Sequence, residues 1–220
     1  MKRIASLIVV SIFMICSLTA CAEKFDASGY VKAVLDNGYY NDATGIVEMG
    51  LSTAEDAVVV YNKGVDSLVD ITLAAITVSP ELEEEYRQFY KDLFAGAKYT
   101  VGEAVEVDET TFEVPVTCEK LNVYANANAS YEAELQALAA VWTEAALAGE
   151  EVPSDEEKYE QFFVLYKDCL KVELAKGVYS APVTVTVKVE NVDGIWTLNT
   201  DDRLNLEYEL IDLKEMFKTQ

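Results

Sequence analysis

Apolar residues recur every three to four positions over long stretches of the chain, which is the pattern of amphipathic helices packed on a core. A capping box at Ser52 marks the start of one helix, and a second capping box at Ser154 marks another. The pattern predicts helices over residues 26–38, 39–50, 52–78, 79–96, 128–149, 154–177 and 201–220.

Between these helices the period changes to two, which predicts β-strands. Residues 99–124 alternate on both sides of a turn at 108–110, and residues 181–199 alternate on both sides of a turn at 193–194. Each segment is therefore expected to form an antiparallel hairpin. Pro115 has no N–H to donate, so we expect its strand at an edge of the sheet.

The order helices, hairpin, helices, hairpin, helix is typical of the α+β class. We expect amphipathic helices packed on one face of an antiparallel sheet made of the two hairpins. Thr184, Thr186 and Lys188 alternate with valines, so the opposite face of the sheet is expected to be partly solvated. No Pro-, Gly- or Ser-rich linker divides residues 27–220, which we interpret as a single domain.

The first 20 residues have the three parts of a secretory signal peptide. Lys2 and Arg3 form the basic part, and Ile4–Ile15 is an apolar run too short for a good membrane span. Small residues then end the segment at Ala20, directly before Cys21. The chain is therefore expected to leave the cytoplasm.

The sequence LTAC at 18–21 resembles the lipobox of bacterial lipoproteins. The resemblance implies cleavage between Ala20 and Cys21, and a lipid with palmitate-like acyl chains on Cys21. Residues 1–20 are then the signal peptide, residues 21–26 are a short tether, and the domain is anchored on the extracytoplasmic face of the cell membrane. An ordinary signal peptide or an uncleaved anchor, with Cys21 incidental, is the alternative.

Two further segments resemble parts of small α+β lipoprotein domains of unknown function from Gram-positive bacteria. They are GYVKAVLDNGYYND in the first helix and VTVTVKVENVDGIWTLN in the last hairpin. Some of these domains have nuclear-transport-factor-like or cystatin-like sheets, which often curl around a pocket. The resemblance implies no fixed catalytic residues.

The charge of the chain is strongly negative, with 39 Asp and Glu against 17 Lys and Arg and a net charge of −22. Without Lys2 and Arg3 the mature chain has 15 basic residues and a net charge of −24. Such a surface repels phosphate backbones and anionic headgroups, so we expect no nucleic-acid partner. Solubility is the plainest role of this charge, and binding of a divalent cation or a cationic ligand is the alternative.

The chain contains no histidine, which removes the commonest general base and the commonest zinc ligand. It also has no Gly-rich phosphate loop and no nucleophile elbow. The acidic stretches around Asp36 and Asp201 lack the spacing of a Ca²⁺ loop. We therefore expect no enzyme, no catalytic residue, no cofactor and no metal site. A hydrolase with paired carboxylates needs no histidine and stays an alternative, although the sequence singles out no pair.

Cys118 and Cys169 are the cysteines that remain after Cys21. Outside the cytoplasm they could form a disulfide. Both occupy apolar positions in a chain with enough core to fold without a crosslink, so two buried free thiols are expected instead.

Four tyrosines lie on the inner faces of predicted helices: Tyr86, Tyr90, Tyr159 and Tyr166. Core packing is the commoner reason for such spacing. A ring around a ligand pocket is the alternative, since tyrosine combines a flat apolar surface with a polar tip.

These patterns favour a membrane-anchored extracytoplasmic lipoprotein with a non-catalytic domain that binds a small ligand or a protein. The alternatives are a scaffold component of the cell envelope and a histidine-free carboxylate hydrolase. The expected partners are the membrane, through the lipid on Cys21, and an unidentified envelope protein or small ligand.

Overall fold

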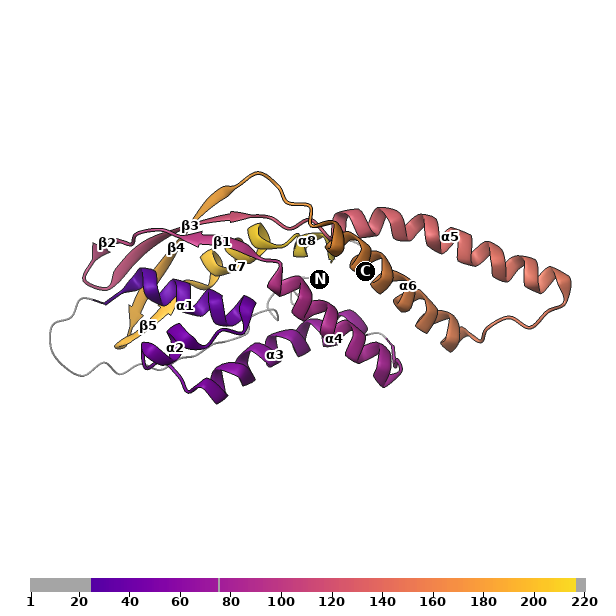
Figure 1. The fold of residues 1–220 in the computed structure, drawn as a ribbon, viewed down its shortest axis with the longest axis horizontal. Helices are drawn as coiled ribbons and strands as arrows, with labels where there is room; N and C mark the ends of the chain where they lie inside the picture. Colours follow the sequence, from indigo (N-terminus) through magenta and orange to yellow (C-terminus); the bar gives the residue numbers. More distant parts are fainter. Residues whose placement is uncertain (1–24, 75, 217–220) are drawn as a thin grey trace.

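The computed structural model describes residues 25–74 and 76–216 of the chain (Figure 1). Groups of helices alternate with groups of strands along these residues. Their order is α1 (Ala27–Tyr40), α2 (Thr44–Glu48), α3 (Ala54–Leu73), α4 (Pro80–Ala95), β1 (Lys98–Val101), β2 (Val105–Asp108), β3 (Thr111–Glu119), α5 (Tyr124–Ala148), α6 (Asp155–Lys176), β4 (Val183–Val192), β5 (Ile195–Leu198), α7 (Thr200–Leu210) and α8 (Leu213–Met216). The predicted α+β class and order of helices and hairpins are confirmed. Ala20 and Cys21, the expected cleavage and lipidation residues, lie outside the described residues.

One antiparallel sheet has β3 and β4 at its centre. These strands pair from Thr111 opposite Glu190 to Cys118 opposite Val183. Strands β1 and β2 pair with the other edge of β3, and β5 pairs with β4. The threonines and the lysine that were expected on the solvated face are exposed. Alternate side chains of the central strands are buried on the other face: Phe112, Val114, Val116, Cys118, Val187 and Val189.

Pro115 lies in an interior strand, so the expectation of an edge strand is wrong. A gap in the neighbouring strand accommodates the proline, because β1 ends at Val101 and β2 begins at Val105. Between them, the backbone N–H of Gly102 donates a hydrogen bond to the Pro115 carbonyl at 2.8 Å. Since the N–H and C=O of one strand residue point to the same side, the position of the missing proline N–H faces this gap.

Helices cover the buried face of the sheet. α1 and α7 contact the strands, and α3 and α4 pack against α1 (Figure 1).

Asp26 caps the start of α1, where its Oδ1 accepts a hydrogen bond from the Gly29 N–H at 2.8 Å. α1 continues past its predicted end at Gly38 to Tyr40, because the residue in the left-handed conformation that stops it is Asn41, with a φ of 54°.

Other helix boundaries also differ from the sequence prediction, since α3 ends at Leu73 instead of residue 78 and α5 begins at Tyr124 instead of residue 128. Thr53, and not Ser52, caps α3, since its hydroxyl accepts a hydrogen bond from the Asp56 N–H at 3.1 Å. Serine and threonine are both good N-caps, so neighbouring candidates are hard to rank from the sequence. The C-terminal helix is divided at Ile211, where an extended backbone separates α7 from α8.

α5 and α6 form a helical hairpin that extends beyond the end of the sheet (Figure 1). Gly149 ends α5 with a φ of 73°, and the predicted capping box of Ser154 and Glu157 starts α6. The base of the hairpin contacts the body where α6 meets α4 and α5 meets α8. α5 has 25 residues. Even so, neither α5 nor any other helix of the described residues is long and apolar enough to cross a membrane.

Candidate functional site

An aromatic cavity of about 390 Å³ lies where the helical hairpin joins the body. Residues at the end of α3, on the buried side of α4, on α5 and α6 and at the end of α8 line it. Of the described residues that line it, none is charged and six are aromatic. The full lining consists of Ile71, Thr72, Ala74, Tyr90, Tyr124, Tyr131, Phe162, Phe163, Tyr166 and Met216. An apolar cavity with a few polar groups is typical of small-molecule sites.

Two tyrosines in the cavity wall are held by the helices that carry them. Tyr90 belongs to the buried stripe of α4 that the sequence predicts. Tyr124 is the first residue of α5, a helix whose own N-cap residue, Val123, supplies no side-chain cap. The buried carboxylate of Asp212 replaces that cap. It accepts hydrogen bonds from the backbone N–H groups of Val123 at 3.0 Å, Tyr124 at 3.1 Å and Ala125 at 2.9 Å.

Most hydroxyls of the cavity have hydrogen-bond partners. Thr72 Oγ1 donates to the carbonyl of Leu68 at 2.8 Å. The short contact between Thr72 Oγ1 and Tyr90 Oη is therefore a hydrogen bond that Tyr90 donates. The hydroxyl of Tyr166 donates to Asn128 Oδ1 at 2.9 Å.

The hydroxyl of Tyr124 is buried without a hydrogen-bond partner. Burial raises the pKa of Tyr124 well above its usual value. The neighbouring Tyr90 hydroxyl adds to this rise. A buried polar group without a partner costs roughly 1–3 kcal/mol, so a ligand that accepts a hydrogen bond from Tyr124 gains from this position.

The tyrosines of the cavity are neutral donors. Burial raises the pKa of Tyr90 to about 12, and burial also raises the pKa of Tyr131. Groups that hold their protons this firmly are poor general bases. The arrangement can therefore bind an uncharged ring that carries a hydrogen-bond acceptor.

The four tyrosines singled out from the sequence have three different positions. Tyr90 and Tyr166 line the cavity. Tyr86 lies in the core, where its hydroxyl donates to the carbonyl of Phe163 at 2.7 Å. Tyr159, expected to face inward, is 53% exposed near the far end of the hairpin. That expectation is wrong, because the hairpin extends into solvent and has no body to pack against there.

Tyr124 and Thr72 are among the cavity residues that the sequence analysis does not single out. Tyr124 lies between the predicted hairpin over 99–124 and the predicted helix over 128–149. Neither the strand alternation nor the helical spacing therefore predicts whether its side chain is buried. Thr72 follows the buried Leu68 by one helical turn and is itself buried. A hydroxyl on an apolar helical stripe is a signal that could have identified it.

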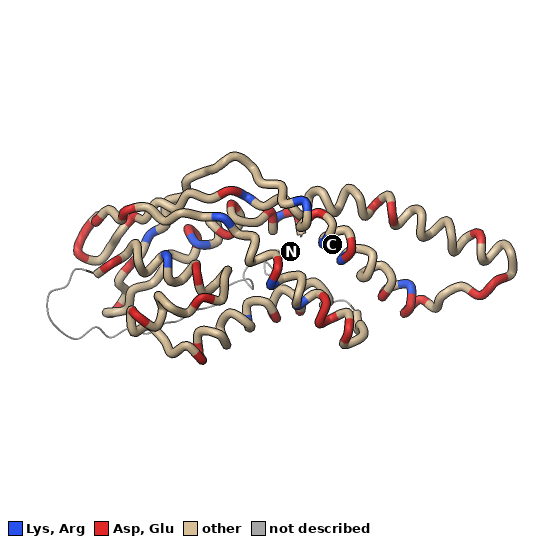
Figure 2. The backbone as a smooth tube through the Cα atoms, in the orientation of Figure 1, with Lys and Arg blue, Asp and Glu red and all other residues tan. Residues whose placement is uncertain are grey.

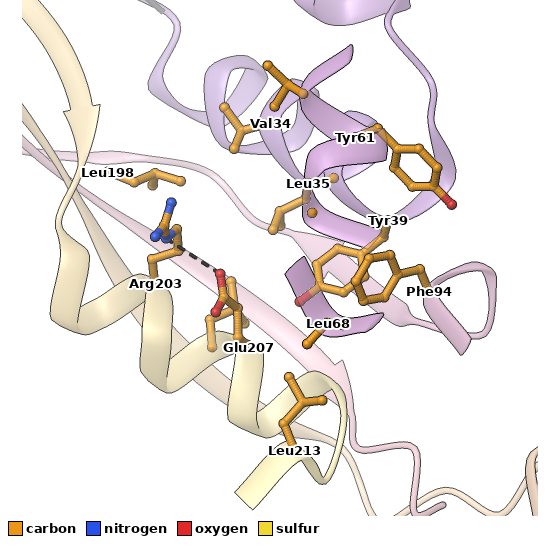
Figure 3. A pocket seen from close by; sticks show the side chains of 14 residues that line it. Val34, Leu35, Tyr39, Tyr61, Leu68, Phe94, Leu198, Arg203, Glu207 and Leu213 are labelled. Carbon is orange, nitrogen blue, oxygen red and sulfur yellow. Dashed lines mark ion pairs between the residues drawn. The ribbon is translucent and has the colours of Figure 1, made fainter. Parts of the chain in front are cut away.

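A second cavity, of about 100 Å³, lies between α1, α3 and α7 (Figure 3). Most of its lining is apolar, and it shares no residue with the aromatic cavity. Arg203 and Glu207 of α7 point into it, with Nε and Oε1 3.5 Å apart and the two side chains 17% and 21% exposed. Burial raises the pKa of Glu207 to about 7, although the positive charge of Arg203 opposes this rise.

Neither cavity brings two carboxylates together. Glu207 is the single carboxylate among the described residues that line the smaller cavity, and the aromatic cavity has none. A glycosidase site needs two carboxyl groups about 5–10 Å apart. The hydrolase alternative therefore has no candidate pair in either cavity.

Cys118 and Cys169 are both buried free thiols. Burial raises the pKa of Cys118 to about 11 and also raises the pKa of Cys169. Both side chains are therefore protonated and unreactive at neutral pH.

Asp36, in the acidic stretch that was considered for Ca²⁺, is engaged by protein groups. Its carboxylate forms an ion pair with Lys32 and accepts a hydrogen bond from the Tyr99 hydroxyl at 2.8 Å. Across the part of the chain that the structure describes, no group of three or more Cys, Asp or Glu side chains is placed to hold a metal ion.

No protein-family model matches this sequence, and no curated protein matches it either. Among solved structures, the fold is similar to the crystal structure of a "putative lipoprotein (ycdA)" from Bacillus subtilis subsp. subtilis str. 168, with a TM-score of 0.53 and 16% sequence identity. The match covers 84% of this chain and 56% of that one, so this chain spans little more than half the length of the other protein. At this identity the similarity concerns the fold alone.

Proposed function

We propose that this chain is a bacterial lipoprotein, anchored to the extracytoplasmic face of the membrane through a lipid on Cys21. Its domain binds an uncharged small ligand in the aromatic cavity and performs no catalysis. The signal-like residues 1–20 and the LTAC sequence support the anchoring. The fold shared with a protein described as a lipoprotein also supports it. Two or more acyl chains hold a protein firmly at a bilayer.

The observation that carries the ligand-binding proposal is the buried, unpartnered hydroxyl of Tyr124, a residue that lines a cavity of about 390 Å³. Aromatic walls favour a flat ring, through stacked or edge-to-face contacts. The described lining has no charge that would compensate the desolvation of an ionic ligand. The ligand class that fits is therefore an uncharged aromatic or cyclic molecule with one hydrogen-bond acceptor.

Three small molecules of similar shape test this ligand class: acetophenone, cumene and benzoate. The methyl group of Met216, which lines the cavity, reports binding in a methyl-labelled NMR titration, and Met49 on the far side of the fold is the internal control. We expect acetophenone to shift Met216 and not Met49. Cumene lacks the acceptor and benzoate carries a charge, so both should bind at least about threefold more weakly.

Three variants connect the binding to the cavity. Tyr124→Phe should weaken acetophenone binding about threefold to tenfold while leaving cumene binding unchanged, since only the hydroxyl is lost. Ala74→Trp places an indole at an exposed position of the lining and should abolish binding of both, whereas Ala175→Trp on an exposed part of α6 should not. Equal binding of benzoate, or unchanged binding in Ala74→Trp, would contradict the proposal.

Replacing Cys21 tests the anchor. We expect Cys21→Ser to leave the membrane fraction or to remain unprocessed, while the wild-type chain is cleaved and membrane-bound with an added lipid mass on Cys21. The control is Cys118→Ser, which keeps the proposed lipidation residue. If the Cys21→Ser chain is processed like wild type and stays on the membrane, the lipid anchor is wrong.

A protein-binding role is the second candidate, and the exposed apolar side chains of the α5–α6 hairpin favour it. Leu147 is 85% exposed and Val141 is 60% exposed. Acidic residues lie beside them at the turn of the hairpin (Figure 2): Glu144, Glu150, Glu151, Asp155, Glu156 and Glu157. Apolar side chains beside carboxylates match a protein surface with an apolar groove and basic surroundings.

Photocrosslinking in intact cells separates this role from simple exposure. A photoreactive amino acid at Val141 or Leu147 should give one defined crosslinked species. The same amino acid at Lys188, on the exposed face of the sheet, should give none. Identical crosslinking patterns at all three positions would argue against a docking role for the hairpin.

A further inference from the structure

Aromatic contacts fix Phe25, the first residue that the structure describes, on the body of the fold. Its ring stacks on Trp196 of β5, with the ring centroids 4.3 Å apart and the ring planes 5° apart. The same ring lies 6.1 Å from Phe112 of β3 and 5.6 Å from Tyr30 of α1. The point at which the chain leaves the body toward Cys21 is therefore held in place by packing.

This exit point lies at one end of an elongated molecule. Phe112 is next to the start of β3, at the β2–β3 turn, whereas the α5–α6 hairpin follows the other end of β3 (Figure 1). β3 has nine residues and α5 has 25, and both run in the same general direction. From the rise per residue in strands and helices, Phe112 and the end of α5 are about 60 Å apart.

The tether between Cys21 and the body is short compared with this length. Cys21 precedes Phe25 by four residues. Residues 21–24 lie outside the described part of the chain, but covalent geometry limits their reach to about 14 Å. A lipid on Cys21 would therefore hold the Phe25 end of the domain near the membrane. The turn of the α5–α6 hairpin could reach the same membrane only if the body lay flat on it.

The charge of the hairpin opposes a flat orientation. Its outer half, residues 141–159, contains six acidic residues and one basic residue, Lys158. Figure 2 shows the acidic residues gathered around the turn. Helices that lie on a membrane surface carry Lys and Arg on their polar face, which is the opposite pattern. Anionic headgroups would therefore repel the segment that contains the exposed Val141 and Leu147.

The Phe25 end also carries acidic residues, but the tether can hold them clear of the headgroups. Asp108 and Glu109 lie at the β2–β3 turn, Asp193 lies at the β4–β5 turn, and all three are exposed. The Debye length is about 8 Å at physiological salt, so a tether with a reach of about 14 Å spans the range of strong repulsion. A flat body would add the acidic residues of the hairpin to this repulsion.

We propose that the domain faces the membrane with the end formed by Phe25 and the β2–β3 and β4–β5 turns, and that its long axis points away from the lipid. The α5–α6 hairpin is then the part farthest from the membrane. This inference rests on the proposed lipid anchor. It means that the exposed apolar side chains of the hairpin meet a protein outside the headgroup region, and not the bilayer to which the chain is anchored.

Two exposed glutamates in turns at opposite ends of the molecule provide a matched test, Glu109 between β2 and β3 and Glu150 between α5 and α6. A fluorescent amino acid replaces one of them at a time in the lipid-bearing chain, which is reconstituted in vesicles of phosphatidylcholine and phosphatidylglycerol at physiological salt. Ni²⁺ chelated on the headgroups is the short-range quencher. We expect loss of most of the fluorescence at Glu109, and no loss at Glu150 beyond that of an unanchored chain. Equal quenching at both positions would show a flat domain, and stronger quenching at Glu150 would identify the bilayer as the partner of the hairpin. Either result overturns the proposal.

A longer tether separates the geometry of the anchor from any affinity of the hairpin for lipid. Insertion of about 30 Gly and Ser residues between Lys24 and Phe25 adds a flexible span of about 30 Å. This insertion should remove most of the quenching at Glu109 and create none at Glu150. Quenching that appears at Glu150 in this variant would mean that the hairpin binds lipid by itself, and the inference would be wrong.

Failure of the anchor and failure of the orientation are separate outcomes. If the native chain carries no lipid on Cys21, the proposed anchor is wrong. The orientation is then measured on a chain that starts at Cys21 and is coupled through this thiol to a maleimide lipid. Cys118 and Cys169 are buried, so they do not compete for the maleimide. The same quenching pattern at Glu109 and Glu150 supports or overturns the orientation in this chain.

Discussion

The carboxylate of Asp212 lies 3.1 Å from the backbone nitrogen of Tyr124, a residue 88 positions earlier in the chain. Asp212 stands between α7 and α8, and it takes the place of a local cap at the start of α5. One side chain thus joins the C-terminal helices to the base of the helical hairpin. It also fixes the backbone of the residue whose hydroxyl has no partner in the aromatic cavity.

Replacing Asp212 by alanine should destabilise the fold by about 3 kcal/mol, because three backbone N–H groups at a helix start lose their acceptor. The free energy of unfolding from urea denaturation measures this change. Asp212→Asn is the matched control, since it keeps one acceptor oxygen and should lose about half as much. An unchanged urea midpoint in Asp212→Ala would show that water replaces the carboxylate at no cost.

Tyr90→Phe and Tyr124→Phe should have opposite effects on stability. Tyr90 donates a hydrogen bond to Thr72, so its loss should cost about 1 kcal/mol. The Tyr124 hydroxyl is buried without a partner, so its removal should leave the free energy of unfolding unchanged or raise it by about 1 kcal/mol. Equal destabilisation by both substitutions would indicate that the Tyr124 hydroxyl is paired within the fold.

Glu207 should make the protein less stable as the pH rises. The folded chain holds a proton on Glu207 up to a pKa of about 7, whereas the unfolded chain releases it near the ordinary value of 4.5. Between these values the folded state binds more protons, so its stability falls with increasing pH. The contribution of Glu207 should fall by about 2–3 kcal/mol from pH 5 to pH 8.

Glu207→Gln isolates this contribution from the other acidic residues, whose titration is common to both proteins. The difference in the free energy of unfolding between wild type and the variant, measured in urea at pH 5, 6, 7 and 8, should shift in favour of the variant as the pH rises. A difference that is constant over this range would mean that Glu207 titrates normally.

The thiols of Cys118 and Cys169 should react slowly in the native state. Burial raises the pKa of both, so the thiolate fraction at pH 8 is small and access is blocked. We expect Ellman's reagent to modify both thiols in urea and to modify them at least about a hundredfold more slowly in the native chain. Absence of reactive thiols in urea without reductant would indicate a disulfide instead.

The sequence by itself determined the local structure, because its signals are local. The apolar stripe of α4, the Ser154–Glu157 capping box and the turn at Asp193-Gly194 each depend on residues within a few positions of one another. The alternation of the valines in β4 likewise determines which side of its strand is buried. These features fix the α+β class and the order of helices and hairpins.

Only the tertiary structure decided which elements meet. Pro115 lies in an interior strand because β1 and β2 leave a gap opposite it, and no local pattern encodes that gap. The hairpin of α5 and α6 extends away from the sheet, which leaves Tyr159 exposed despite its helical spacing. The aromatic cavity and the Asp212 cap join segments far apart in the chain. Burial and hydrogen bonding between such segments depend on how they pack in space. The hydrophobic periodicity of one segment does not say which other segment packs against it.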